Sequence, residues 1–301
     1  MLEAPASRPS ATYEEAVERA GAIAARDDDR VLPEGRTALL TSGARAPLAV
    51  VLFHGFTNHP GQYAQFAPLL AERGVNVFAP RMWGHGYRDR MSRDLERFDM
   101  GKGLAGAYEA LDAASGLGDR VAVLGISLGG VLAAHIAQHR ADVALAVPIA
   151  PDIAILNFPY PVSRGAGMAM RFLPNRFQWW DPRVKEAQRP ATAYPQFSTR
   201  ALGQTLLLSD AVYGAARSSA PAAARITTIS NRRDPAVNHK VTEKVVSLWT
   251  DRRGDGTVSL VDIEGLPANH DIVDPDNPLA RTDLVYPVLL NALLAGEEGP
   301  A

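Results

Sequence analysis

The sequence predicts an α/β fold with a mostly parallel central sheet, helices on both faces of the sheet and an inserted cap. Three observations predict it. Apolar, β-rich runs alternate with segments of helical periodicity, and strands separated by helices pair in parallel. This alternation breaks over residues 151–224, which indicates an insertion. With 47% hydrophobic and 21% charged residues, the 301-residue chain has the composition of a globular enzyme with a full core.

The expected elements follow one another in a regular order. Residues 1–11 are predicted to be a mobile tail, and Thr12 and Glu15 then form a capping box that opens an amphipathic helix. Strands are expected at residues 37–40, 48–53, 75–79, 121–124, 143–149, 225–230 and 258–263. Helices are expected at residues 63–73, 103–115 and 128–138, and a last helix carries Leu289, Leu290, Leu293 and Leu294.

This order divides the chain into three parts. An N-terminal tail and helix take residues 1–30, the α/β core takes residues 31–150 and 225–301, and the cap takes residues 151–224. Residues 151–200 hold eight aromatic residues, which supply a large apolar area with few rotamers. They could line an acyl pocket or form the cap's own small core, and the candidates for the pocket are Phe158, Trp179 and Trp180.

Charge and composition restrict the partners. A net charge of −2 gives no basic field for nucleic acid, and the absence of cysteine excludes disulfides and thiolate metal sites. The N-terminus lacks the basic start and apolar core of a signal peptide, and no apolar run reaches the length of a membrane span. We therefore expect a cytoplasmic protein with a small-molecule substrate, no nucleic-acid partner and no stable membrane anchor. The oligomeric state is left open.

The most informative motif is Gly125-Ile126-Ser127-Leu128-Gly129, which follows the apolar run 121–124 and precedes a helical segment. Glycines on both sides of a serine are typical of a sharp, strained strand-to-helix turn, because residues without Cβ let the backbone fold back and expose the serine Oγ. Ser127 is therefore the candidate covalent nucleophile. The alternative is a serine in an ordinary glycine-rich turn.

A serine hydroxyl is a poor nucleophile at neutral pH, so it needs a base and a group that orients this base. Asp234 follows the expected strand 225–230, and His270 follows the last expected strand. Both lie at the carboxyl end of a strand, as Ser127 does. In these roles His270 takes the serine proton and returns it to the leaving group, while Asp234 holds the imidazole tautomer.

Other residues compete for these two roles. Asp152 follows the strand at 143–149 and Asp262 lies near the end of the last strand, so either is an alternative acid. Asp234 could also be an ordinary turn residue before a proline. His239 competes with His270, but it lies only five residues beyond Asp234 on the same connection.

An oxyanion that develops on the substrate needs hydrogen-bond donors. The N–H of Leu128, at the start of a predicted helix, is one candidate. His54-Gly55-Phe56 stands directly after the strand 48–53, and the N–H of Phe56 is the second candidate, since Gly55 lets this loop approach closely. We expect His54 itself to be structural.

At these residues the chain resembles the serine α/β-hydrolases of the carboxylesterase and monoacylglycerol lipase type. The resemblance is carried by His54-Gly55-Phe56, by the motif around Ser127, and by Trp83-Gly84-His85-Gly86, which is similar to the R-G-H-G turn of those enzymes. It spans about residues 45–295 and is weakest in the cap. Where relatives have Asp-x-Arg before the turn, this chain has Pro80-Arg81-Met82.

The resemblance implies an α/β-hydrolase fold, a structural role for His85, and a triad in the chain order Ser127, Asp234, His270. Together with the residues themselves it predicts cleavage of short- to medium-chain carboxylic esters, or of monoacylglycerol-like esters, through an acyl-Ser127 intermediate. A thioesterase, an amidase or an acyltransferase would use the same triad, and a ligand-binding pseudoenzyme is the alternative from another class.

Neither a cofactor nor a metal is expected. No G-x-G-x-x-G or P-loop motif follows a strand, so a nucleotide cofactor has no predicted site. His135 and His139 lie four residues apart on a predicted helix, which is a spacing that suits a metal ion, but the zincin glutamate is replaced by Ile136. A surface position is the simpler interpretation of this pair.

Overall fold

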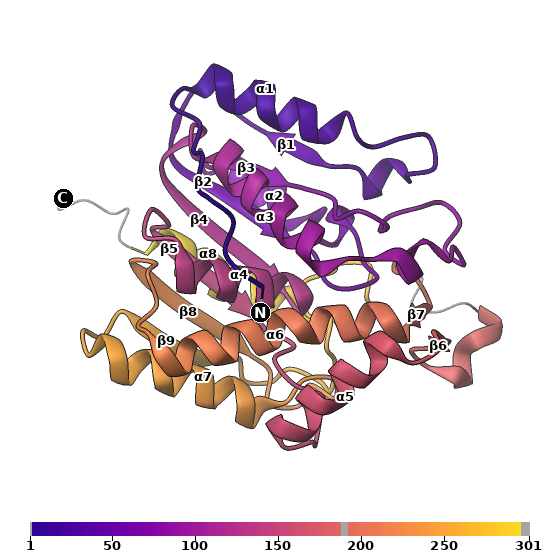
Figure 1. The fold of residues 1–301 in the computed structure, drawn as a ribbon. Coiled ribbons are helices and arrows are strands. Elements are labelled where there is room, and N and C mark those ends of the chain that lie inside the picture. The colour runs from indigo at the N-terminus through magenta and orange to yellow at the C-terminus, as the bar shows by residue number, and fades with distance from the viewer. Residues whose placement is uncertain (1, 188–191, 296–301) are drawn as a thin grey trace.

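The computed structural model describes residues 2–187 and 192–295 and contains a seven-stranded sheet with the order β1-β3-β2-β4-β5-β8-β9 (Figure 1). β1 pairs antiparallel with β3, and the other neighbours in this sheet are parallel. The predicted α/β fold is confirmed. Its strands are β1 (Ala38–Leu40), β2 (Ala46–Phe53), β3 (Asn76–Ala79), β4 (Gly118–Ile126), β5 (Leu145–Ile149), β8 (Arg225–Ser230) and β9 (Val258–Asp262).

Helices cover both faces of the sheet, as predicted. One hydrophobic cluster joins one face to α1 (Tyr13–Ala24), α3 (Met100–Ala114), α4 (Leu128–His139), α6 (Thr199–Ser218) and α7 (His239–Arg253). A second cluster joins the other face to α2 (Phe66–Ala71) and α8 (Thr282–Leu294). Short 3-10 turns are η1 (Pro33–Gly35), η2 (Pro60–Tyr63), η3 (Asp94–Arg97) and η4 (Pro182–Ala187).

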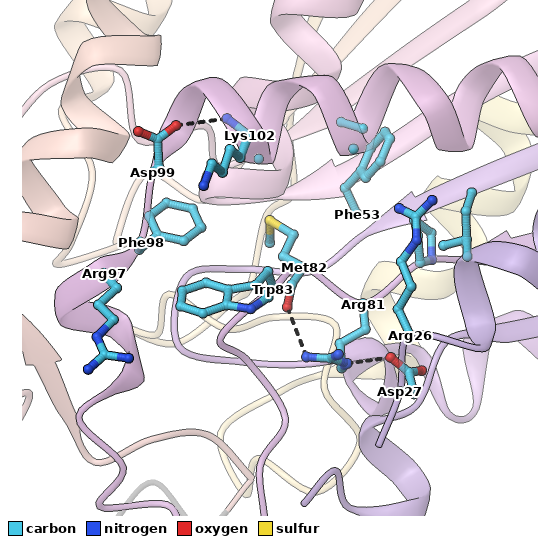
Figure 2. A pocket seen from close by; sticks show the side chains of 15 residues that line it. Arg26, Asp27, Phe53, Arg81, Met82, Trp83, Arg97, Phe98, Asp99 and Lys102 are labelled. Atoms are coloured by element: carbon cyan, nitrogen blue, oxygen red, sulfur yellow. Dashed lines mark hydrogen bonds and ion pairs between the residues drawn. The ribbon is translucent and has the colours of Figure 1, made fainter.

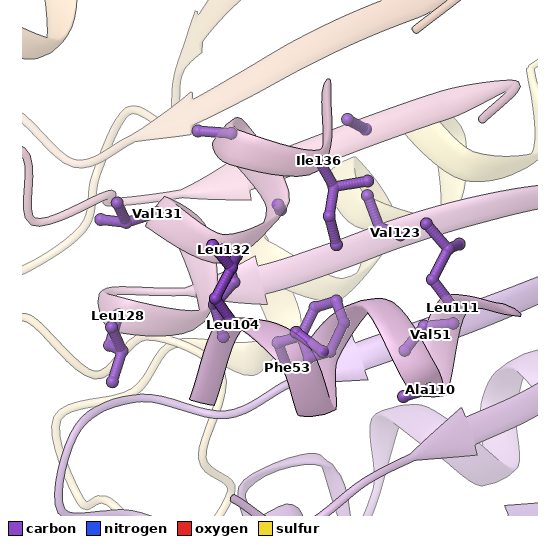
Figure 3. Close-up of a cluster of buried hydrophobic side chains, with 14 of the residues drawn as sticks. Val51, Phe53, Leu104, Ala110, Leu111, Val123, Leu128, Val131, Leu132 and Ile136 are labelled. Atoms are coloured by element: carbon purple, nitrogen blue, oxygen red, sulfur yellow. The ribbon is translucent and has the colours of Figure 1, made fainter. Parts of the chain in front are cut away.

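β2 shows why the central strands are apolar throughout. Val51 and Phe53 join the cluster of α3 and α4, which Figure 3 shows, while Val50 and Leu52 join the opposite cluster. Successive side chains of a strand point to opposite faces, so a strand covered on both faces needs apolar residues at every position.

Two predicted stretches differ from the structure. The single helix predicted at residues 63–73 is instead η2 followed by α2. Pro68 would lie inside the longer helix, where it lacks an N–H and clashes with the preceding turn, whereas in α2 it lies in the first turn. No helix was predicted at α7, although Val241, Val245 and Trp249 repeat at helical spacing and are buried.

The segment before α1 was expected to be a mobile tail, but in the structure hydrogen bonds attach it to α3. The Ser10 N–H donates to the Asp112 carbonyl at 2.8 Å, and the Arg8 N–H donates to the Asp112 carboxylate at 2.8 Å. The predicted N-cap of α1 is present, since the Glu15 N–H donates to the Thr12 hydroxyl at 3.2 Å. Residue 1 lies outside the described residues.

The segment between β5 and β8 contains α5 (Tyr160–Phe172), β6 (Phe177–Trp179), β7 (Gln196–Ser198) and α6. β6 and β7 pair antiparallel in a separate small sheet, and α5 packs against α6 (Figure 1). Leu208, Val212 and Ala216 of α6 belong to the core cluster, so α6 covers the core directly. Residues 188–191 of the predicted cap and 296–301 of the predicted core lie outside the described residues.

None of the helices that the structure describes combines the length and the apolarity that a bilayer crossing requires.

Candidate active site

Ser127 stands on a strained turn between β4 and α4. Its φ of 58° lies in the left-handed region, which is rare for residues other than glycine and is found at functional sites. The Ser127 N–H donates to the Ile149 carbonyl of β5 at 2.9 Å, which fixes the turn to the neighbouring strand. The side chain is only partly buried.

Close backbone packing explains the glycines around Ser127. A Cβ at Gly125 would overlap the carbonyl oxygen of Gly129, and a Cβ at Gly129 would overlap the carbonyl oxygen of Phe53. A Cβ at Gly130 would come within 2.7 Å of the Ile149 carbonyl oxygen. The turn therefore requires glycine at all three positions for steric reasons.

Asp234 and His270 are brought together at the carboxyl ends of β8 and β9. The His270 Nδ1 lies 2.7 Å from the Asp234 Oδ2, and the other Asp234 oxygen accepts the Ala236 N–H at 2.8 Å. The Asp234 side chain is 0% exposed and that of His270 is 28% exposed. Because Nδ1 donates to the carboxylate, the Nε2 of a neutral imidazole carries the lone pair.

Three carboxylates influence this histidine. Burial lowers the pKa of His270, but the charge and hydrogen bond of Asp234, with the charges of Asp271 and Asp152, outweigh it and leave the pKa above 6.5. Burial raises the pKa of Asp152 to about 6; the charge of Asp234 adds to this rise, and that of His270 opposes it. Asp152 is thus near the pair, while Asp234 makes the hydrogen bond.

The loop after β2 lies against the serine. A Cβ at Gly55 would be 3.6 Å from the Ser127 Cβ. In the part of the chain that the structure describes, the N–H groups of Phe56 and Leu128 have no protein acceptor. Two unused donors, one on each side of the turn, suit a developing oxyanion. No described hydrogen bond joins the Ser127 hydroxyl to His270; in the absence of substrate, such bonds are often long.

His54 and His85 are held in the interior. The His54 Nδ1 lies 2.9 Å from the Gly55 carbonyl, and its Nε2 accepts the Met82 N–H at 3.1 Å, so both ring nitrogens are used. Burial, with the neighbouring His85, lowers the pKa of His54 well below 6.5, and burial lowers the pKa of His85 to about 4. Both rings are neutral at pH 7, which fits the structural roles expected for them.

The sequence reasoning missed Thr57. This β-branched residue has a φ of 66° and is buried next to Phe56. Its hydroxyl accepts the Trp180 indole N–H at 3.0 Å, and its carbonyl accepts the Tyr194 N–H at 2.9 Å. The predicted cap is therefore attached to the proposed oxyanion loop. A positive φ at a threonine carries no signal in the sequence.

A second missed group joins the same loop to the histidine. The Gly55 N–H donates to the Gln62 Oε1 at 2.8 Å, and the Gln62 Nε2 donates to the Asp271 Oδ2 at 2.8 Å. The Asn58 amide donates to the same carboxylate oxygen at 3.0 Å. One buried side chain, Gln62, thus connects the residue before Phe56 with the residue after His270.

The remaining candidates differ in how close they lie to these contacts. Asp262 forms an ion pair with Arg232 at 2.8 Å, and the ring of His239 lies 3.3 Å from the backbone carbonyl of Asp234. Phe158 is 49% exposed and Trp179 lies in β6. The Trp180 ring contacts that of Phe56 edge-on at 6.2 Å between centroids, so this candidate adjoins the oxyanion loop.

The surface position expected for the two histidines of α4 is wrong for His135. His135 is buried and its Nδ1 lies 3.1 Å from the Tyr108 hydroxyl, while His139 is exposed. Burial and the neighbouring His139 lower the pKa of His135 to about 3. Among the described residues, no group of three or more His, Cys, Asp or Glu side chains could hold a metal ion.

A serine exposed on a sharp turn at the carboxyl edge of a parallel sheet defines the α/β-hydrolase class. Within that class, the model of the family described as Hydrolase_4 (serine aminopeptidase, S33) matches residues 44–233. The chain belongs to this family of hydrolases.

The chain is also similar to three proteins of known name or structure. Over 103 residues the chain is 33% identical to the thermostable monoacylglycerol lipase of Bacillus sp. (strain H-257), and the match covers 34% of this chain and 40% of that protein. A structure reported with LipS and LipT, two metagenome-derived lipolytic enzymes, superposes with a TM-score of 0.65 at 18% identity over 88% of this chain and 99% of that chain. The structure of Paleococcus ferrophilus monoacylglycerol lipase superposes with a TM-score of 0.64 at 17% identity, over 86% of this chain and 98% of that chain. These two likenesses show the fold.

Proposed function

We propose that this hydrolase cleaves carboxylic esters through an acyl-Ser127 intermediate. The observation that carries the proposal is the hydrogen bond of 2.7 Å between the His270 Nδ1 and the buried Asp234 carboxylate. It holds the tautomer in which Nε2 accepts a proton, at the sheet edge where Ser127 directly follows β4.

In the proposed reaction, the Ser127 Oγ attacks the ester carbonyl carbon while the His270 Nε2 takes its proton. The carbonyl oxygen becomes an oxyanion that accepts the N–H groups of Phe56 and Leu128, and each donor is worth roughly 3 kcal/mol in the transition state. The ester C–O bond then breaks, and the imidazolium returns the proton to the leaving alcohol. Water, activated by the same histidine, attacks the acyl-serine and releases the acid.

The proposed substrates are short- to medium-chain esters or monoacylglycerol-like esters. The relatives named as lipolytic enzymes and monoacylglycerol lipases support this choice. We propose that residues 151–224 act as a cap and that Phe158, Trp179 and Trp180 contribute to the acyl pocket. The contact of the Trp180 ring with Phe56 supports a position of this indole close to the reacting ester.

The same residues would serve a thioesterase, an acyltransferase or an amidase, and the family description names an aminopeptidase. A ligand-binding pseudoenzyme would keep the fold without turnover. A small-molecule ester as the only partner and a cytoplasmic location are further parts of the proposal, and cell fractionation tests the location.

Labelling with a fluorophosphonate probe separates the enzyme from the pseudoenzyme. The wild type is expected to react covalently, and Ser127→Ala is expected to stay unlabelled. A panel of p-nitrophenyl esters of increasing length, run beside the matching thioesters and anilides, then ranks the acyl donors by chain length and by the bond that is cleaved. A wild type that fails to label would end the proposal, and a preference for anilides would move it to amide cleavage.

The same panel tests the acyl pocket. Truncation of the indole in Trp180→Ala is expected to reduce the hydrolysis of long esters more than that of acetyl esters, because only long chains contact it. Trp179→Ala is the parallel variant on the adjacent position. Equal losses on all chain lengths would assign these side chains to the cap's own packing.

A further inference from the structure

A cavity of about 540 Å³ lies between the end of α1, the first half of α3 and the loop after β3 (Figure 2). Among the described residues that line it, none belongs to the proposed triad or to the two oxyanion donors. Small-molecule sites have volumes of roughly 300–1,000 Å³, so this cavity is large enough for a ligand of its own.

The floor of the cavity is apolar. Phe53, Met82 and Phe98 line it and are nearly excluded from bulk solvent, while the ring of Trp83 lies beside Met82 and is 49% exposed (Figure 2). On α3, Gly106 also lines the cavity, and a Cβ there would meet no heavy atom within 4 Å. An alkyl or aryl group can therefore enter without displacing protein atoms.

One end of the cavity carries unpaired positive charge. Arg97 and Lys102 lie on either side of Phe98 in Figure 2, and both are exposed. Over the described ranges 2–187 and 192–295, neither side chain has an ion-pair partner. The nearby Asp99 accepts the Lys102 backbone N–H at 2.9 Å as the N-cap of α3. Arg97 and Lys102 carry two positive charges and Asp99 carries one negative charge, so the net charge at this end of the cavity is positive.

At the other end of the cavity the charged side chains are paired. Arg81 pairs with Asp27 at 2.6 Å, and both side chains are almost fully buried. Arg26 forms an ion pair with Glu109. An anionic ligand would therefore be oriented with its charge toward Arg97 and Lys102 rather than toward these paired groups.

The wall nearest the N-terminus lies outside the family match. Ile23 and Arg26 of the α1 end and Asp27 line the cavity, whereas the family model matches residues 44–233. The Asp27 carboxylate holds this wall in place, since it accepts the Thr37 N–H at 2.6 Å in addition to its ion pair. The cavity is thus formed by this chain's own N-terminal helix together with the shared core.

We propose that this cavity binds a small apolar monocarboxylate, with its alkyl or aryl body on Phe53, Met82 and Phe98 and its carboxylate between Arg97 and Lys102. The site is separate from the proposed ester site and does not depend on turnover. Its recognition rests on an apolar body joined to one negative charge, so a neutral alcohol of the same length should bind more weakly.

The test is calorimetric titration of the full-length protein with octanoate and with octanol. Octanoate is expected to bind more tightly than octanol. Lys102→Glu should weaken octanoate binding about tenfold and leave octanol binding unchanged, because it reverses one charge at the rim. Lys244→Glu, at another exposed lysine with no described ion pair, gives the same change in net charge and should have no effect.

A second variant tests the floor. Gly106→Phe places a ring in the open space and should abolish the binding of both ligands, with thermal unfolding as the check that the variant is folded. Absence of octanoate binding, or binding that neither variant changes, would overturn the proposal. Loss of binding in Trp180→Ala alone would place octanoate in the proposed acyl pocket and also overturn it. This binding test does not require hydrolysis, since Ser127→Ala can be titrated in the same way. A failure of the binding proposal would therefore leave the proposed hydrolysis unaffected.

Discussion

The turn that carries Ser127 and the loop that carries His270 are held in place by different means. The turn is fixed by backbone contacts, since the Ser127 N–H donates to the Ile149 carbonyl and backbone carbonyls pack where side chains of its glycines would otherwise lie. The loop is fixed by side chains, because the Asn231 amide donates to the Pro267 and Asn269 carbonyls and Gln62 holds Asp271. The difference suggests that changes at the turn reduce stability, whereas changes around the loop reduce the reaction rate.

The largest expected effect on rate is at the acid. Asp234→Asn should lower kcat for p-nitrophenyl acetate by about 10⁴-fold, because an amide no longer holds the His270 tautomer that serves as a base. Asp152→Asn, at the alternative carboxylate, should keep activity within about tenfold of the wild type, since Asp152 makes no described hydrogen bond to His270. Steady-state kinetics checks both variants. The reverse ranking would make Asp152 the orienting acid.

A substitution in the turn that carries Ser127 should reduce the stability of the protein rather than its reaction rate. Gly129→Ala is expected to lower the free energy of unfolding by about 3 kcal/mol, because its Cβ overlaps the Phe53 carbonyl oxygen. Gly21→Ala in α1 is the control, since a Cβ there meets nothing within 4 Å and alanine favours a helix by about 1 kcal/mol. Urea unfolding measures both. A Gly129→Ala protein as stable as the wild type would show that the turn can relax.

Gln62 tests whether the two regions are coupled. Gln62→Met keeps the size of the side chain but removes its hydrogen bonds to Gly55 and Asp271, so kcat should fall about 10- to 100-fold with little change in KM. Gln65→Met, at an exposed position three residues further on, should be neutral. An unchanged kcat in Gln62→Met would mean that the loop and the oxyanion donors are positioned independently.

The smallest expected effect is a shift in pH dependence. His270, the proposed base, accepts a proton only when it is neutral, and its pKa is raised above 6.5, so kcat/KM should fall as pH drops through a value above 6.5. Asp152→Asn removes a charge that raises this pKa and should move the acid limb to lower pH by less than about one unit. A pH profile from 5 to 9 checks both statements. A wild-type kcat/KM that falls only well below pH 6.5, or an acid limb that moves to higher pH in Asp152→Asn, would contradict these statements.

Local patterns were sufficient for the sheet and for the glycine-rich turn. Each depends on neighbouring residues: the continuous apolar run of β2, whose successive side chains join opposite clusters, and the glycines within three positions of Ser127. The single helix predicted at residues 63–73 is shorter in the structure, because Pro68 is tolerated only in the first turn of a helix and α2 therefore begins at Phe66. The sequence favoured Asp234 as the partner of the histidine but left Asp152 as an alternative, since both follow strands at the same edge.

By itself the sequence determined the class of fold, the family motif and the position of the serine, because these depend on side-chain periodicity and on steric limits within a few residues. Only the tertiary structure decided which carboxylate binds His270, that Gln62 joins two loops, and that the end of α1 lines a cavity together with Phe53. The physical reason is that these contacts join residues 36 to 209 positions apart, and their distances follow from how the strands and helices pack.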